Sequence, residues 1–160
     1  MPLPDLIKQW TPMQKRRASL AVTGTLVSWS LAALVACASP GPKPALYVQL
    51  GGVQALQSIT DRTMDRVATD PATRRTFEGV NLKTLKTSVA AYVCKVADGP
   101  CVYEGETMVN SHAQLNIQGS EFDRMVTVLR DELNHAGVPE GAKNELLRRL
   151  APTRRDIVKP

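Results

Sequence analysis

The chain has 160 residues, of which 43% are hydrophobic and 22% charged, and its formal net charge is +5. A length of this order suits one domain. Four of the 20 Lys and Arg and one of the 15 Asp and Glu precede Cys37, which leaves a net charge of only +2 for the rest. The basic balance therefore gives no argument for nucleic-acid binding, and we expect no nucleic-acid partner.

The start of the chain has the pattern of an export signal. Residues 1–17 carry four Lys and Arg, and residues 18–37 carry no charge. A cationic start followed by an apolar run is typical of a secretion signal. A run of this length would also span a bilayer as a helix, so a plain transmembrane anchor is the alternative.

The end of this run, "LVAC" from Leu34 to Cys37, resembles the lipobox of bacterial lipoproteins. The resemblance implies that a signal peptidase removes residues 1–36 and that the Cys37 thiol carries a lipid anchor. No Asp follows Cys37, which implies sorting to the outer membrane, facing the periplasm. Residues 37–45 contain three prolines and a glycine and are expected to form a stiff tether. The folded domain is then predicted to span 46–160.

Helical spacing accounts for the next part of the chain. The segments 51–71 and 80–100 each end at a proline, Pro71 and Pro100. A short segment carrying Phe77 lies between them. Residues three and four apart predict one buried face in each segment: Val53, Leu56, Ile59, Thr60, Met64 and Val67 in the first, and Leu82, Leu85, Val89, Tyr92, Val93 and Val96 in the second.

Two further helices follow a brief segment at 105–118. The segment 119–139 has Ser120 as its expected N-cap and is terminated by Gly137. Its apolar stripe consists of Phe122, Met125, Val126, Leu129 and Leu133, and a last helix from about 139 places Leu146, Leu147 and Leu150 inward. No alternating pattern of useful length predicts a strand. We therefore predict an all-α fold.

The two histidines of the chain differ in their setting. His112 stands in "VNSHAQLNI", between small polar residues and an apolar turn, and taken alone it is more commonly a surface or half-buried residue than a ligand. His135 lies in the last turn of the predicted 119–139 helix. A cation near the carbonyl end of a helix is mildly favourable, so His135 is interpreted as structural.

Cys94 and Cys101 remain as a pair if Cys37 is lipidated. An even pair in an exported domain favours a disulfide. Closing so short a loop stabilises the fold by about 2.5 kcal/mol in the chain-entropy model. Two reduced thiols are the alternative. The spacing suits neither a zinc finger nor a thioether haem attachment.

Seven motifs, in order, resemble those of group 1 truncated haemoglobins: "LYVQLGG", "DRVATDP", "FEGV", "LKT", "YEGETMVNSHAQLNI", "GVPEG" and "LAPTRRDIV". The resemblance covers Leu46 to Val158. It implies a two-over-two helical sandwich around haem (iron protoporphyrin IX), with paired glycines at Gly51 and Gly52 and with Phe77 packed on the porphyrin.

The resemblance also implies the iron ligand. The proximal histidine of the family follows a Tyr-x-Gly turn and a methionine, matched here by Tyr103, Gly105 and Met108 before His112. Haem iron takes a neutral imidazole on its proximal side. The other ring nitrogen then donates to a nearby carbonyl, which fixes the tautomer. The further residues expected at the haem are Met64, Phe77, Leu85, Val89, Tyr92 and Met108, with Lys83 and Lys86 either pairing with the propionates or forming a solvated helix face.

The opposite side of the haem departs from the family pattern. The usual tyrosine position is Met64 and the usual glutamine position is Val89, with Leu85 one turn earlier. Loss of a donor forfeits about 1.5–3 kcal/mol of charge-assisted hydrogen bonding. This weakens oxygen binding roughly ten- to hundredfold, whereas carbon monoxide and nitric oxide depend less on donors. Met64 either fills the pocket or closes the sixth position on the iron with its thioether, and Tyr92 would supply a donor only from one turn further on.

These features predict a haem-binding truncated globin that is lipid-anchored on the periplasmic face of an envelope membrane and binds a diatomic gas. The alternative is a haem-free helical lipoprotein that serves as a binding or scaffold module. An enzyme that detoxifies nitric oxide or peroxide is a third class, which would need bound oxygen or an acid–base group over the iron. The sequence indicates neither, and it leaves enzymatic activity open. The sequence identifies no redox partner.

Overall fold

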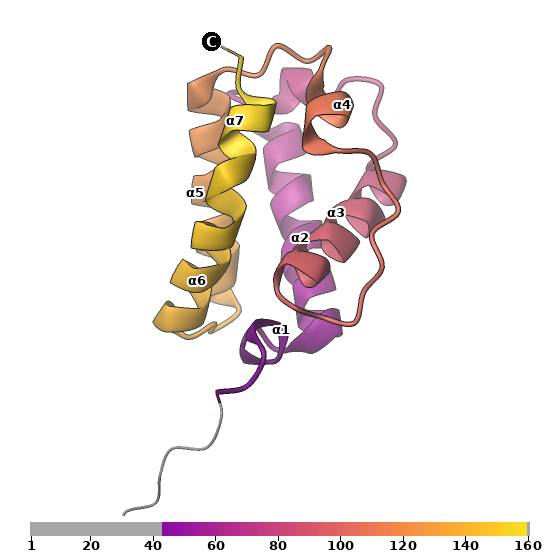
Figure 1. Ribbon diagram of the computed structural model, residues 1–160. Helices are drawn as coiled ribbons and strands as arrows, with labels where there is room; N and C mark the ends of the chain where they lie inside the picture. The colour runs from indigo at the N-terminus through magenta and orange to yellow at the C-terminus, as the bar shows by residue number, and fades with distance from the viewer. Residues whose placement is uncertain (1–42, 160) are drawn as a thin grey trace, which may run out of the picture. The chain divides into compact units, whose positions relative to one another are not determined.

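The structure, a computed structural model, describes residues 43–159 (Figure 1). The predicted signal peptide of residues 1–36, the lipidation site Cys37 and residues 37–42 of the predicted tether lie outside the described residues. In the part of the chain that is described, no helix combines the length and the apolar character needed to cross a membrane.

The described residues are helical and contain no strand. Ile117 and Val158 form one isolated parallel bridge. In chain order the elements are α1 (Leu46–Gln49), α2 (Gly52–Thr69), the 3-10 helix η1 (Arg74–Phe77), α3 (Leu82–Val96), α4 (Met108–His112), α5 (Gly119–His135), α6 (Glu140–Leu150), the 3-10 helix η2 (Ala151–Thr153) and α7 (Arg154–Ile157). The all-α prediction is confirmed.

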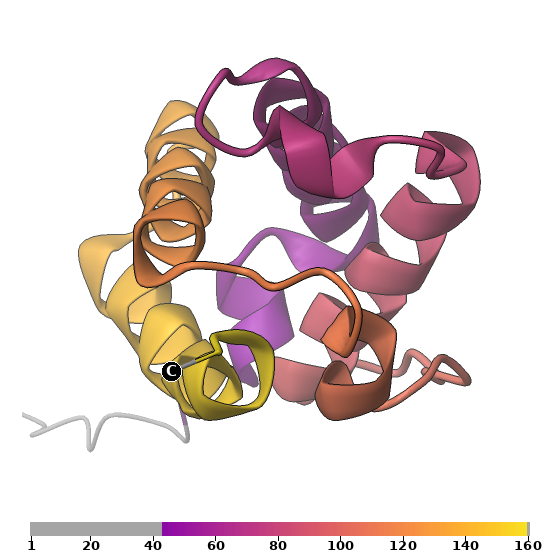
Figure 2. The ribbon, with the colours of Figure 1, turned by 90° about the horizontal axis from the view of Figure 1, so that it is seen from above.

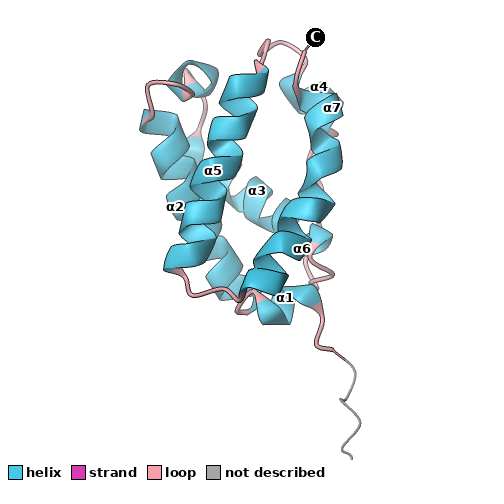
Figure 3. Ribbon diagram, turned by 90° about the vertical axis from the view of Figure 1, so that its left-hand side faces the viewer, coloured by secondary structure: helices cyan, strands magenta, loops and turns pink. Residues whose placement is uncertain are grey.

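Two helix pairs form the sandwich. α2 packs against α3, α5 packs against α6, and contacts from α2 to α5 and from α3 to α6 join the pairs. Figure 1 shows α2 and α3 on one side and α5 and α6 on the other, and Figure 2 shows the same separation from above. Figure 3 faces the α5–α6 pair, with α2 and α3 behind it. The predicted two-over-two arrangement is therefore confirmed.

The start of α2 depends on the paired glycines. Gly51 has φ +94° and Gly52 has φ +81°, values that side-chain-bearing residues rarely adopt. A Cβ on Gly51 would also lie 2.7 Å from the Ala55 Cβ. The residues predicted for the buried face of α2 are buried except Val53, which is 43% exposed. The prediction for Val53 is wrong because periodicity marks a face of the helix, but not how far along the helix that face is covered.

The start of α5 also differs from the prediction. Ser120 is not the N-cap, because the helix already begins at Gly119 and Gln118 precedes it as the cap. The Glu121 carboxylate reaches back and accepts a hydrogen bond from the Gln118 N–H at 2.8 Å. Glutamine is not among the favoured N-cap residues, so the serine was the stronger sequence signal.

The core consists of two clusters with different degrees of burial. The larger joins α1 and the N-terminal half of α2 to the C-terminal halves of α3 and α5 and to α6: Leu46, Leu50, Leu56, Ile59, Val93, Cys94, Ala97, Leu129, Leu133, Ala142 and Leu146. The smaller has a buried centre of Met64, Val67 and Val128, against which partly exposed side chains pack: Phe77, Leu85, Val89 and Met125. Partly buried side chains also pack on the larger cluster, but in the smaller cluster they outnumber the three buried residues at its centre.

A buried carboxylate joins the two helix pairs. Glu132 of α5 is 4% exposed and accepts hydrogen bonds from Arg62 Nε and Arg66 Nη1 of α2, both at 2.7 Å. Burial alone would raise the pKa of Glu132, but the two guanidinium groups outweigh it and hold this pKa below its usual value. The contact fixes α2 against α5 beside the smaller cluster.

Candidate functional site

The smaller cluster unites four residues singled out from the sequence. Met64 of α2 is 2% exposed and forms the buried centre together with Val67 and Val128. Phe77 packs on this centre from the end of η1, and Leu85 and Val89 pack on it from α3. Three elements that are separated along the chain thus place apolar side chains around one point.

The position of α3 follows from its first turn. The Asn81 side chain accepts a hydrogen bond from Thr84 N at 3.2 Å and caps the helix. Leu85 and Val89 are four residues apart and therefore lie on one side of α3. Both are half-buried, and Val89 also packs against the larger cluster. Neither of these two side chains carries a hydrogen-bond donor.

His112 is the last residue of the short helix α4. Its ring Nδ1 lies 2.8 Å from the Met108 carbonyl oxygen and 2.9 Å from Ser111 Oγ. A carbonyl only accepts, so we assign the ring proton to Nδ1. In the neutral ring Nε2 then carries the lone pair. Within residues 43–159, no hydrogen-bond partner is found for Nε2.

The start of α4 is equally well defined. The Thr107 hydroxyl accepts a hydrogen bond from Asn110 N at 3.2 Å and caps the helix. Upstream, the Tyr103 hydroxyl donates to the Glu106 carbonyl at 2.7 Å, so the ring folds back over the turn. A Cβ on Gly105 would lie 2.5 Å from the Tyr103 hydroxyl oxygen. A larger residue at this position would therefore displace the Tyr103 ring from the turn.

Tyr92 of α3 contacts this turn and not the Met64 cluster. Its ring meets the Tyr103 ring edge-to-face, with centroids 5.2 Å apart and an interplanar angle of 68°. Burial raises the pKa of Tyr92, and Tyr103 and Asp156 raise it further, so the hydroxyl keeps its proton at neutral pH. Tyr92 links α3 to the segment that leads into α4, a role that the sequence did not indicate.

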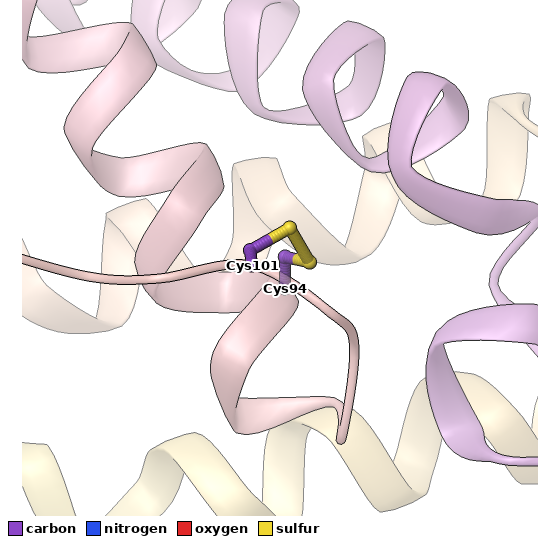
Figure 4. The surroundings of a disulfide bond; sticks show 2 residues. All are labelled: Cys94 and Cys101. Atoms are coloured by element: carbon purple, nitrogen blue, oxygen red, sulfur yellow. A yellow bond between two sulfur atoms is a disulfide. The ribbon is translucent and has the colours of Figure 1, made fainter.

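A disulfide between Cys94 and Cys101 strengthens the same link (Figure 4). The two Cα atoms are 5.8 Å apart. A Cβ on Gly99 would lie 2.5 Å from the Cys94 sulfur, so the turn inside the loop has room only for glycine there. The bond ties the end of α3 to the residue two positions before Tyr103.

Lys83 and Lys86 lie in different surroundings. Lys86 Nζ is 2.5 Å from Asp65 Oδ1 and so pairs α3 with α2, a partner not expected from the sequence. Lys83 instead lines an open surface groove of about 580 Å³ between α3 and the 102–105 loop. The other lining residues are mostly polar: Thr84, Thr87, Ser88, Ala91, Val102, Tyr103, Glu104 and Gly105.

A second cavity, of about 180 Å³, lies between α5 and the C-terminal elements and was not predicted. Its lining is mainly apolar: Phe122, Val126, Leu129, Leu147, Leu150 and Ala151, with Asp123 and Arg154. The Arg154 guanidinium lies 5.8 Å from the centroid of the Phe122 ring. His135 lines neither cavity. Its side chain is 73% exposed, and its Nδ1 is 3.8 Å from Glu132 Oε1.

A two-over-two helical sandwich, with a histidine on a short helix and an apolar cluster formed by α2, η1, α3 and α5, defines a globin-like protein. A family model described as "Bacterial-like globin" matches residues 45–159, and the chain belongs to this family. It is similar to the group 1 truncated hemoglobin GlbN of Nostoc commune, with 30% identity over 93 residues, 58% of this chain and 79% of that protein. The GlbN of Mycolicibacterium paratuberculosis is 29% identical over 113 residues, 71% of this chain and 83% of that protein.

Solved structures agree with the fold. The truncated hemoglobin of Tetrahymena pyriformis, in its Fe(III) form, superposes with a TM-score of 0.70 at 23% identity, covering 73% of this chain and all of that one (100%). The hemoglobin of the phototroph Chloroflexus aurantiacus superposes with a TM-score of 0.64 at 26% identity, covering 73% of this chain and 100% of that one. The family is one of haem-binding globins, which supports gas binding as the general class of function.

Proposed function

We propose that this protein binds haem through His112 and uses the cluster around Met64 as an apolar pocket for a diatomic gas. The observation that carries the proposal is the contact between His112 Nδ1 and the Met108 carbonyl at 2.8 Å. It fixes the ring orientation and leaves Nε2 unprotonated, with a lone pair for coordination. This is the form that haem iron requires of an axial imidazole.

The apolar surroundings fit the same group. Phe77, Leu85, Val89 and Met125 pack on the buried centre yet remain partly exposed. Each square ångström of apolar surface removed from water contributes about 25 cal/mol. A flat apolar macrocycle lying against these side chains would therefore be stabilised by them. When bound, haem would supply an iron that accepts a diatomic gas, and these residues would exclude water from it.

The pocket would hold oxygen weakly. Met64, Leu85 and Val89 carry no polar hydrogen that could stabilise the negative charge that oxygen acquires on binding. Met64 is almost fully buried among Val67 and Val128, which supports the interpretation that it fills space. Tyr92 contacts Tyr103 and packs on the larger cluster, so it is poorly placed as a substitute donor.

The location of the protein is also a proposal. The sequence resembles a lipoprotein precursor that is anchored through Cys37 and faces the periplasm. The Cys94–Cys101 disulfide supports it, because disulfides persist in oxidising compartments such as the periplasm and are rare in the cytosol.

The two histidines allow a matched experiment. We expect the mature protein to give a sharp Soret band on titration with haem, and His112→Ala to lose the axial coordination that sharpens it. His135→Ala serves as the control, because that side chain is exposed and should leave the spectrum unchanged. A band that survives unchanged in His112→Ala would contradict the assignment. No band in any variant would instead favour a haem-free binding or scaffold module, the reading that the missing distal donors support.

A further inference from the structure

The chain leaves α4 through a sharp turn that one arginine holds. After His112 the backbone turns at Asn116, which adopts the left-handed region at φ +46°. Arg75 of η1 donates from Nη1 to the Leu115 carbonyl at 3.1 Å and from Nη2 to the Asn116 carbonyl at 2.9 Å. A side chain 40 residues earlier in the sequence therefore binds the carbonyl groups of the third and fourth residues after His112.

The same guanidinium also engages the first turn of α5. Arg75 Nη2 lies 2.5 Å from Glu121 Oε2, and this oxygen accepts the Gln118 N–H at 2.8 Å. Glu121 is 8% exposed, so its charge needs a partner. The planar guanidinium presents five N–H donors in fixed directions, which lets one side chain serve two carbonyls and a carboxylate together.

This arrangement connects the two halves of the candidate site. Arg75 stands two residues before Phe77 in η1, and Leu115 stands three residues after His112. Leu115 N donates to the His112 carbonyl at 3.1 Å, so the clamped turn is continuous with α4. The distance between the Phe77 segment and the His112 segment is thus set by a side chain that contacts neither ring.

The short length of α4 makes such a clamp necessary. A helix of five residues has too few internal hydrogen bonds to be stable alone. Its position has to come from its attachments. The entry side is attached to α3 through the Tyr92–Tyr103 contact and the disulfide. On the exit side Arg75 supplies the attachment to η1 and, through Glu121, to α5. The Ile117–Val158 bridge and the packing of α4 on α7 attach the same region to the C-terminal segment.

We propose that Arg75 is a positioning residue for His112. It holds the turn after α4 in register with Phe77, so that the imidazole Nε2 keeps the place needed for axial ligation. This inference rests on the proposed function in one respect only, the consequence for haem. The clamp itself is a property of the protein that can be measured separately.

The experiment uses the full mature protein and three variants. Arg75→Met removes the clamp, and Arg75→Lys keeps the charge but cannot reach all three acceptors. Arg74→Met is the matched control, because Arg74 lies beside Arg75 in η1, is exposed and forms no side-chain hydrogen bond or ion pair within the described residues. Amide hydrogen exchange of residues 108–118 reports the clamp, and the rate of haem transfer to an apomyoglobin acceptor reports its consequence.

For Arg75→Met we expect the rate of amide exchange in 108–118 and the rate of haem loss each to rise by about 5- to 10-fold. This is the lower end of the effect of losing charge-assisted hydrogen bonds, because solvent screens a half-exposed side chain. The iron–histidine stretching band should also broaden or shift. Arg74→Met should match the wild type, and Arg75→Lys should fall between. Equal exchange and equal haem loss in Arg75→Met and Arg74→Met would overturn the proposal.

The results distinguish a failure of the proposed haem binding from a failure of the proposed role of Arg75. If the wild type binds no haem, the proposed function fails, and exchange in 108–118 still decides whether the clamp exists. If haem binds but the band and the transfer rate do not respond to faster exchange, Arg75 has no positioning role. If Arg75→Met does not fold, Glu121→Gln removes the charge pair, leaves an oxygen for Gln118 N and gives the same readouts with a smaller expected rise.

Discussion

Replacing Met64 with tyrosine should convert the proposed pocket into one that retains oxygen. Met64 is 2% exposed and packs in one cluster with Leu85 and Val89, none of which offers a donor. A tyrosine hydroxyl there would supply the missing hydrogen bond. Bonds to charged or partly charged acceptors contribute about 1.5–3 kcal/mol, which corresponds to roughly 10- to 150-fold slower oxygen dissociation.

The bulk of the new ring has to be separated from its hydroxyl. Adding atoms to a packed site costs about 1–3 kcal/mol in stability and can itself alter ligand escape. Met64→Phe introduces nearly the same ring without the donor and is therefore the control. Stopped-flow mixing of the oxygenated ferrous protein with excess carbon monoxide gives the dissociation rate of each variant. If Met64→Tyr and Met64→Phe release oxygen at the same rate, the position does not face the ligand and the alignment of this helix is wrong.

Two further predictions concern acid stability and anchoring. Because the guanidinium groups of Arg62 and Arg66 hold the pKa of Glu132 below its usual 4.5, the carboxylate stabilises the fold above that pH, and the contribution is lost as the pH falls through the lowered pKa. Urea unfolding over a pH series should show a flatter acid limb in Glu132→Gln than in the wild type, and parallel limbs would contradict the ion-pair argument. Replacing Cys37 with serine should abolish labelling with a fatty acid and leave residues 1–36 uncleaved, and unchanged labelling would exclude Cys37 as the lipidation site.

The helices were predictable because their cause is local. The three-and-four spacing of Leu56, Ile59 and Met64 reports one buried face of α2, and the boundary at Pro71 reports a missing N–H. The role of His112 as iron ligand stays a prediction, and it has a different basis, since a Tyr-x-Gly turn, a methionine and a histidine at fixed spacing resemble a known arrangement. The Tyr103 ring occupies the space that a Cβ at Gly105 would take, so the glycine lets the ring fold back over the turn.

The contacts that hold the site together were not predictable from the sequence. Arg75 and Glu121 are 46 residues apart, and nothing in the pattern of either segment indicates the other. Lys86 illustrates the same limit, because a lysine on a helix face looks equally suited to a propionate, to water or to the Asp65 that it meets. Local patterns determine which face of a helix is apolar, whereas the choice among charged partners depends on how the helices are placed in three dimensions.

The uneven burial of the two clusters bears on the choice between the proposed globin and a haem-free module. In the larger cluster Leu50, Leu133 and Leu146 are at most 1% exposed, and partly buried side chains pack around this extensive buried centre. In the smaller cluster the side chains around Met64 are left partly open on α3, η1 and α5, although the chain evidently can bury such residues. Contiguous apolar surface on a soluble domain marks a place where something binds. A haem-free scaffold would need another apolar partner at that position, and it would leave unexplained why the His112 ring is held by Nδ1 while no partner is found for Nε2 within residues 43–159. One bound macrocycle accounts for both features, and its binding free energy would add directly to the stability of the folded state.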